Sequence, residues 1–316
     1  MTGSRVVALG HYQPAKVLTN HDLAAMVDTS DEWITSRVGI RTRHIGGPDE
    51  PVDELAAHAA AKALASAGLQ PSDIDLVLVA TSTAIDRSPS MSARVAARLG
   101  MAAPAVMDIN VVCSGFTHAL ATADHTLRAG AATRALVIGA DKMGDIVDWT
   151  DRSSCVLMGD GAGAAVVVAD TARSGRPGIG PVLWGSVPGM GDAVRIEGTP
   201  PRFAQEGQAV YRWATTQLPP IARKVCEKAG LTPEDLAAVV LHQANLRIIE
   251  PVARRIGAVN AVVARDVVDS GNTSAASIPM ALSKLVERGE IPGGAPVLLF
   301  GFGGNLSYAG QVISCP

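Results

Sequence analysis

The sequence predicts an α/β protein made of two similar halves, and three observations support this prediction. Short apolar runs rich in Val, Leu and Ala alternate with helical patterns along the chain. The apolar runs do not alternate with polar residues, as expected for strands that helices cover on both faces. A set of turn motifs also recurs at a fixed distance. Because 316 residues exceed what one hydrophobic core usually holds, two packed halves are expected.

Strands and helices are predicted in the following order. Five runs have the composition of buried strands, at residues 76–80, 135–138, 164–168, 239–241 and 297–300. Helical patterns occupy residues 52–67, 91–99 and 207–229. Apolar residues make up 47% of the chain, but only 11 residues are aromatic, so small aliphatic side chains are expected to fill the core.

The turn motifs repeat with one offset. A Gly-Leu-x-Pro motif precedes a strand twice, and both its glycines (230 − 68 = 162) and its prolines (233 − 71 = 162) are 162 residues apart. Each copy continues with a strand, a Gly turn and a helix (107–115 then 116–128, and 262–271 then 272–287), and closes with a Gly-rich turn into a strand (159–163 and 301–305). We interpret these as halves spanning residues 1–170 and 171–316, joined in the Gly/Pro-rich stretch 171–191. The alternative is two unrelated αβ units that share common turn chemistry.

Charge and cysteine content exclude several functions. The net charge of −3 gives no overall attraction for nucleic acid or anionic lipid. No apolar run has the length of a signal peptide core or a membrane span, so a cytoplasmic protein is expected. The four cysteines form no CxxC pair or Cys/His cluster, which argues against zinc, iron–sulfur clusters and disulfides.

Cys113 is the candidate nucleophile. It follows the predicted strand 105–112, and Ser114-Gly115 lead into a helix expected from Phe116. Free N–H groups and the positive dipole end of that helix favour a thiolate, so we expect a pKa below the usual value of about 8.5. The alternative is a structural cysteine. The other three cysteines lack this setting and are assigned to packing.

His242 and Asn272 are the candidate partners. His242 directly follows the strand 239–241, and strand C-terminal ends are where α/β sheets place their sites. Asn272 stands at the expected start of the second-half helix, as Cys113 does in the first half. The alternatives are a core histidine and an N-cap asparagine. Symmetry between the halves would bring the two helix starts together, so all three side chains are expected to line one pocket.

These motifs resemble β-ketoacyl–acyl carrier protein synthase III, the initiating condensing enzyme of bacterial fatty acid synthesis in the thiolase superfamily. The resemblance covers nearly the whole chain and rests on residues 28–34, 38–44, 113–116, 159–165, 242–248 and 271–277. It implies a thiolase-like fold with α-β-α-β-α layers. It also implies decarboxylative condensation of an acyl-CoA with malonyl-acyl carrier protein, giving a 3-oxoacyl-acyl carrier protein without a metal or redox cofactor.

The resemblance also implies a role for each matching residue. The Cys113 thiolate takes up the acyl group, His242 and Asn272 donate hydrogen bonds to the thioester oxygen, and the N–H groups of Cys113 and Gly304 form the oxyanion hole. The positions that match CoA contacts are Thr29, Trp33, Arg37, Arg152 and Asn245. Those that match the carrier-protein docking patch are Arg212, Arg247, Arg254 and Arg255, although a solvated helix face is the alternative for Arg254-Arg255. Ser88 matches the residue that lines the partner subunit's acyl channel in a homodimer.

Four departures from the family pattern affect the choice of primer. Val111-Val112 replace the usual small residues before the nucleophile, Asn305 replaces a glycine, and Leu241 replaces a proline. Ser88 is small and leaves room for a longer or branched acyl chain. A starter synthase or acyltransferase of specialised polyketide metabolism is therefore an alternative function. A non-catalytic scaffold is a third, but it usually has a broken triad.

Overall fold

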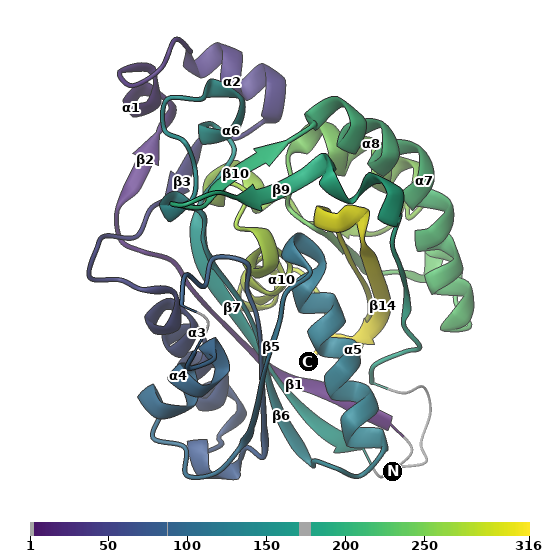
Figure 1. The fold of residues 1–316 in the computed structure, drawn as a ribbon. Helices are drawn as coiled ribbons and strands as arrows, with labels where there is room; N and C mark the ends of the chain where they lie inside the picture. The colour runs from purple at the N-terminus through teal and green to yellow at the C-terminus, as the bar shows by residue number, and fades with distance from the viewer. Residues whose placement is uncertain (1–2, 87, 171–177) are drawn as a thin grey trace.

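Two five-stranded sheets organise the computed structural model, which describes residues 3–86, 88–170 and 178–316 (Figure 1). The first sheet has the order β1-β7-β6-β4-β5 and the second the order β8-β14-β13-β11-β12. In each, the first two strand pairs are antiparallel and the last two are parallel. The strands of the first sheet are Gly3–Tyr12 (β1), Asp160–Asp170 (β7), Arg134–Lys142 (β6), Leu76–Ala80 (β4) and Ala105–Ile109 (β5). Those of the second are Leu183–Gly185 (β8), Tyr308–Ser314 (β14), Pro296–Phe302 (β13), Ala238–Leu241 (β11) and Val262–Val263 (β12).

Helices form three layers around these sheets. Helices α5 (Gly115–Arg128) and α10 (Ser277–Glu287) lie between the sheets and share one buried apolar cluster with both. Helices α3 (Val52–Ala67) and α4 (Met91–Arg98) cover the outer face of the first sheet. Helices α7 (Gly207–Lys228) and α8 (Leu246–Ile256) cover that of the second. The predicted α/β fold with layered, duplicated halves is confirmed.

The repeated motif has the same local structure in both halves. The helix that precedes it ends at a glycine with positive φ in the first copy (Gly68, +65°), and Gly230 has a φ of +70° in the second. Pro71 and Pro233 then each begin a 3₁₀ turn closed by a capping box. The acidic residue of the box accepts the backbone N–H three residues upstream, which closes the 3₁₀ turn that precedes the next strand.

Three predicted segments differ from the structure. Residues 159–163 are not a turn, because β7 begins at Asp160; its glycines instead admit α10, whose Met280 N would lie 2.6 Å from a methyl group on Gly163. Residues 262–271 form only the two-residue β12 followed by helix α9 (Val267–Ser270). The predicted strand 105–112 ends at Ile109, and residues Val112–Ser114 form a 3₁₀ turn.

The described part of the expected connection 171–191 contains regular secondary structure. Residues 171–177, including Pro177, lie outside the described part of the chain. The remainder holds β8 and the start of a 3₁₀ segment (Pro188–Ala193). The smaller elements are β2 (Val17–Thr19), α1 (Asn20–Ala24), α2 (Asp31–Val38), β3 (Thr42–His44), α6 (Arg152–Cys155), β9 (Val194–Glu197) and β10 (Arg202–Gln205).

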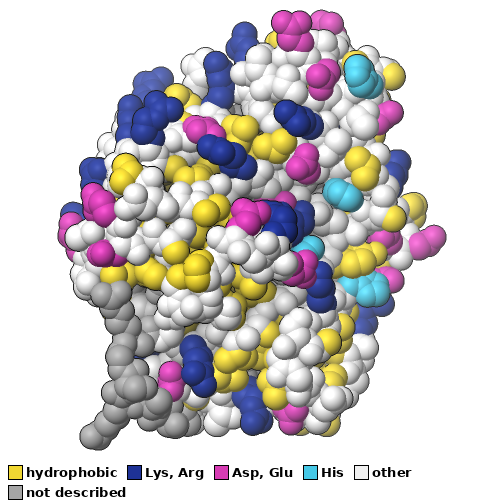
Figure 2. All heavy atoms as spheres, turned by 180° about the vertical axis from the view of Figure 1, so that it is seen from behind, with side chains coloured by type: hydrophobic (Ala, Val, Ile, Leu, Met, Phe, Trp, Pro, Cys, Tyr) yellow, Lys and Arg dark blue, Asp and Glu magenta, His cyan; other side chains and the backbone are white. Residues whose placement is uncertain are grey.

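The surface carries both signs of charge, with one concentration of basic residues. Seen from behind in Figure 2, Lys and Arg side chains gather at the upper left, the side on which α7 and α8 lie. No helix among residues 3–86, 88–170 and 178–316 is long and apolar enough to cross a membrane.

Candidate active site

A cavity of about 190 Å³ lies where the two halves meet, and Cys113, His242 and Asn272 all line it. The structure therefore brings together three side chains that are far apart in the sequence. The rest of the wall is mostly apolar near the catalytic end and carries Arg37 and Arg247 toward its mouth. Further lining residues are Leu157, Phe203, Val210, Tyr211, Asn245, Phe302, Gly303 and Gly304.

Cys113 sits in the 3₁₀ turn Val112–Ser114 between β5 and α5. Val112 has a φ of +50°, which a β-branched residue rarely adopts, so the surrounding structure must hold this tight turn in place. The loop that follows β13 passes directly over the sulfur. A methyl group on Gly303 would lie 2.7 Å from Cys113 Cβ and 3.1 Å from its Sγ. Only glycine allows this approach, which brings the Gly304 amide to the thiol.

The acidity of Cys113 differs from the expectation. Burial raises the pKa of the thiol to about 11, and the nearby Ser274 hydroxyl and Gly304 amide oppose this effect only in part. The predicted lowering of the pKa is therefore wrong for the free protein. Excluding water destabilises the thiolate by more than the free N–H groups and the dipole at the start of α5 stabilise it.

His242 directly follows β11, and its backbone N–H donates to the carbonyl of Phe300 at 2.9 Å. The ring is buried, with Nδ1 2.8 Å from Ser277 Oγ and the Phe302 ring edge-on at 5.4 Å between centroids. Burial lowers the pKa of His242 to about 3, so the imidazole is neutral at neutral pH. A neutral imidazole has one nitrogen that donates and one that accepts.

Asn272 is held by its backbone and by its own side chain. Its N–H donates to the Leu157 carbonyl at 2.8 Å, and its carbonyl accepts from Gly159 N at 3.0 Å. Its Oδ1 accepts from the N–H of Ser274 at 2.9 Å, which leaves the Nδ2 amide group to donate into the cavity. Asn272 does not begin a helix as expected, because a 3₁₀ turn (Ser274–Ala276) separates it from α10.

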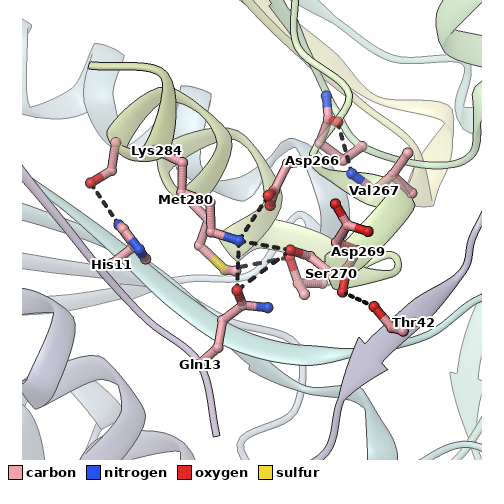
Figure 3. Close-up of polar contacts among 12 residues, drawn as sticks. His11, Gln13, Thr42, Asp266, Val267, Asp269, Ser270, Met280 and Lys284 are labelled. Carbon is pink, nitrogen blue, oxygen red and sulfur yellow. Dashed lines mark hydrogen bonds and ion pairs between the residues drawn. The ribbon is translucent and has the colours of Figure 1, made fainter. Parts of the chain in front are cut away.

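A polar cluster holds helix α9, the segment that leads into Asn272 (Figure 3). Lys284 of α10 donates to Asp266 Oδ1 at 2.8 Å, Ser270 Oγ at 2.9 Å and Gln13 Oε1 at 2.6 Å. Asp266 precedes α9 and Ser270 is its last residue, and the helix leads directly into Gly271 and Asn272. Because Gln13 belongs to the first half, this ammonium group ties both halves to the loop of the site.

The predicted CoA residues lie at and beyond the mouth of the cavity. The guanidinium carbons of Arg152 and Arg37 lie 4.8 Å and 5.7 Å from the centre of the Trp33 ring. Thr29 Oγ1 is buried and has no hydrogen-bond partner within the described residues. Asn245 lines the cavity and caps α8, with Oδ1 accepting from Ile248 N at 3.1 Å.

The predicted docking arginines fall into two groups. Arg212 and Arg247 line the outer mouth together with Arg37 and Tyr211. Arg254 and Arg255 occupy the last turn of α8, about 10 Å further along the helix axis. Arg255 also donates to the Thr215 carbonyl and so joins α8 to α7.

Some residues of the site were not identified from the sequence, and Ser88 lies apart from it. Ser88 is exposed and does not line this cavity. Ser277 and Phe302, which contact His242, were inside quoted motifs but had no assigned role. Asp141 was missed entirely: it is buried, its pKa is raised by burial, and it accepts hydrogen bonds from Thr83 Oγ1 and Ala275 N. Cys155, Cys226 and Cys315 are free, buried and outside the cavity.

The fold and this site define a condensing acyltransferase of the thiolase superfamily: a buried thiol, a neutral histidine and an oriented amide share one cavity. Residues 107–186 match the family 3-oxoacyl-[acyl-carrier-protein] synthase III, and residues 226–315 match its C-terminal part. The chain belongs to this family.

Relatives and solved structures agree with this assignment. A β-ketoacyl-[acyl-carrier-protein] synthase III of Streptomyces avermitilis is 82% identical over the full length of both chains. One of Streptomyces coelicolor is 79% identical over 99% of each chain. The priming β-ketosynthase of the R1128 polyketide pathway superimposes with a TM-score of 0.96 at 40% identity, covering 100% of this chain and 97% of its own. The synthase III of Aquifex aeolicus gives a TM-score of 0.93 at 38% identity, covering 99% of this chain and all of its own.

Proposed function

We propose that this enzyme joins an acyl-CoA primer to malonyl-acyl carrier protein by decarboxylative Claisen condensation, through an acyl group on Cys113. The observation that carries the proposal is the shared cavity, in which one nucleophile faces two side chains free to donate hydrogen bonds. In the first step Sγ bonds to the primer carbonyl, the C–S bond to CoA breaks, and the thiol proton leaves with CoA.

In the second step the malonyl carboxyl group leaves as CO2, and its bonding electrons form an enolate on the carrier thioester. His242 and Asn272 donate hydrogen bonds to the enolate oxygen, where the negative charge collects. The enolate carbon then attacks the acyl-Cys113 carbonyl, whose oxygen is held by the N–H groups of Cys113 and Gly304. The C–S bond breaks, and the thiolate takes up a proton.

The high pKa of Cys113 has a role in this scheme. A thiol that is mostly protonated resists alkylation and oxidation in the free enzyme. Because His242 is neutral, no permanent ion pair with the thiol forms at neutral pH. We therefore infer that the Cys113 thiol loses its proton and attacks only when a primer thioester is bound, with the Gly304 amide next to the sulfur.

CoA and the carrier protein are proposed to use the same mouth in turn. Arg152 packs on the Trp33 ring at 4.8 Å, so the two side chains would move apart to hold adenine between an aromatic face and a guanidinium plane, with Thr29 as a further nucleotide contact. Arg37 would contact the CoA phosphates and Asn245 the pantetheine arm, and both residues line the cavity. The acidic carrier protein would dock on Arg212, Arg247, Arg254 and Arg255.

We infer a homodimer from the edge of the first sheet. Strand β5 is an edge strand that is mostly exposed, and it presents Val106 and Met107 to solvent. Such an edge readily pairs with another chain, and a second β5 would extend both sheets. Ser88, on the loop before α4, would then reach the acyl channel of the second subunit. A division into halves at residue 170, cofactor independence and a cytoplasmic location also remain predictions.

Polyketide priming is the second candidate function, favoured by the close structural match to the R1128 priming β-ketosynthase. Mass spectrometry of the intact protein mixed with acetyl-, isobutyryl- or octanoyl-CoA, followed by malonyl carrier protein, tests both candidates. We expect one acyl adduct that is absent in Cys113→Ala and present in Cys226→Ala, then a 3-oxoacyl carrier product. Loading without this product would favour simple acyl transfer, and no loading from any CoA thioester would refute the proposal.

A further inference from the structure

Ser277 is the only described residue with a hydrogen bond to Nδ1 of His242. It is the first residue of α10 and is completely buried, as His242 nearly is. Its Oγ lies 2.8 Å from His242 Nδ1 and accepts the backbone N–H of Gln243 at 3.2 Å. No hydrogen bond to Nε2 of His242 occurs within the described residues, so that nitrogen is left for the cavity.

Counting protons decides which nitrogen of His242 carries the hydrogen. A serine hydroxyl has one proton to donate and two lone pairs. The Gln243 N–H can only donate, so it occupies a lone pair of Ser277 Oγ. If Nδ1 also donated to Oγ, the serine proton would be buried without an acceptor, which costs about 1–3 kcal/mol. If instead Ser277 donates to Nδ1, all these groups are satisfied, and the hydrogen of His242 is on Nε2.

We propose that Ser277 is a positioning residue that holds neutral His242 as the Nε2–H tautomer, so that the imidazole donates to the enolate oxygen. The catalytic use of this tautomer rests on the proposed function, whereas the tautomer itself follows from the hydrogen bonds of Ser277 alone. The opposite tautomer would direct the Nε2 lone pair at the developing negative charge and repel it. The Gln243 N–H anchors the hydroxyl from the other side, so its direction does not depend on substrate.

The helix α10 offers a matched control. Ser283 is also buried on this helix, and its Oγ lies 2.9 Å from Nδ1 of His11, outside the catalytic cavity. Replacing either serine by alanine thus removes the same kind of bond from the same helix. We would compare Ser277→Ala with Ser283→Ala, using Ser277→Thr as the variant that keeps the hydroxyl.

Two measurements on the whole enzyme test the proposal. The first is ¹⁵N NMR of histidine-labelled protein, which shows which ring nitrogen carries the proton and needs no activity. We expect an Nε2–H signal for His242 in the wild type and loss of its predominance in Ser277→Ala only. The second separates loading of Cys113 from condensation. In Ser277→Ala we expect condensation to fall on the order of 100-fold and loading to fall far less, with Ser277→Thr recovering much of the loss.

The outcomes separate this inference from the proposed function. An Nδ1–H signal in the wild type, or equal condensation rates in Ser277→Ala and Ser283→Ala, would overturn the role of Ser277. If His242→Ala condenses at the wild-type rate, the proposed role of His242 fails, whatever the tautomer. If Ser277→Ala does not fold, the wild-type NMR signal and the Ser277→Thr rates still decide.

Discussion

The buried thiol predicts an unusual pH profile for Cys113. At pH 7 a thiol with a pKa of about 11 is ionised to about one part in ten thousand, against about one part in thirty at the usual value of about 8.5. Because the thiolate is the reactive form, alkylation of Cys113 should be about 300-fold slower than that of an unperturbed thiol at pH 7. The rate should then rise about tenfold per pH unit up to about pH 10.

Iodoacetamide labelling followed by peptide mapping measures this profile directly. A free cysteine peptide gives the reference rate, and Cys226 gives an internal control, since it is fully buried and lines no part of the cavity. Cys226 should stay unlabelled in the folded enzyme. A plateau in the Cys113 rate near neutral pH would refute the reasoning, because it would mean that the start of α5 outweighs burial after all.

Three further predictions follow from the contacts described above. Gly303→Ala should lower the acylation rate of Cys113 at least 100-fold, because the new methyl group would lie 2.7 Å from Cys113 Cβ. Gly189→Ala has open space around it and should leave this rate unchanged. Equal acylation rates of the two variants, followed by intact-protein mass spectrometry, would contradict this. Lys284→Met should lower the free energy of unfolding by about 3 kcal/mol in urea titrations, because it leaves the mostly buried carboxylate of Asp266 without its ion-pair partner. An unchanged midpoint would show that the cluster does not contribute to stability. Trp33→Ala should weaken CoA binding about tenfold by calorimetry, and an unchanged Kd would remove this ring from the nucleotide site.

The sequence allowed the framework to be predicted because periodicity and turn chemistry are local. Helix α3 has the predicted bounds, since apolar spacing defines it and Gly68 ends it. The chemistry-bearing side chains could be named because each follows a strand or turn with a recognisable motif. The pKa of Cys113 could not be predicted, because it depends on how completely distant segments exclude water from the sulfur.

The bonds that orient the site were also beyond sequence reasoning. Ser277 lies 35 residues from His242 in the chain, and only the packing of α10 beside β11 brings them together. The glycines of 159–163 were interpreted as a turn because their composition favours one. In the structure Gly161 and Gly163 instead make room for α10, a helix more than a hundred residues away in the chain.

Because the two sheets share a topology, positions in one half have counterparts in the other. Helix α5 begins at Gly115 and α10 at Ser277, and the offset of 162 (277 − 115) also relates Ala80 to His242 (242 − 80). In the first half this pair is a tight apolar contact, since a methyl group on Gly115 would lie 2.9 Å from Ala80 Cβ. In the second half the same pair is hydrogen-bonded. Equivalent positions therefore make different contacts in the two halves: the apolar pair lets α5 pack closely on β4, and the polar pair is the one that we propose orients the proton of His242.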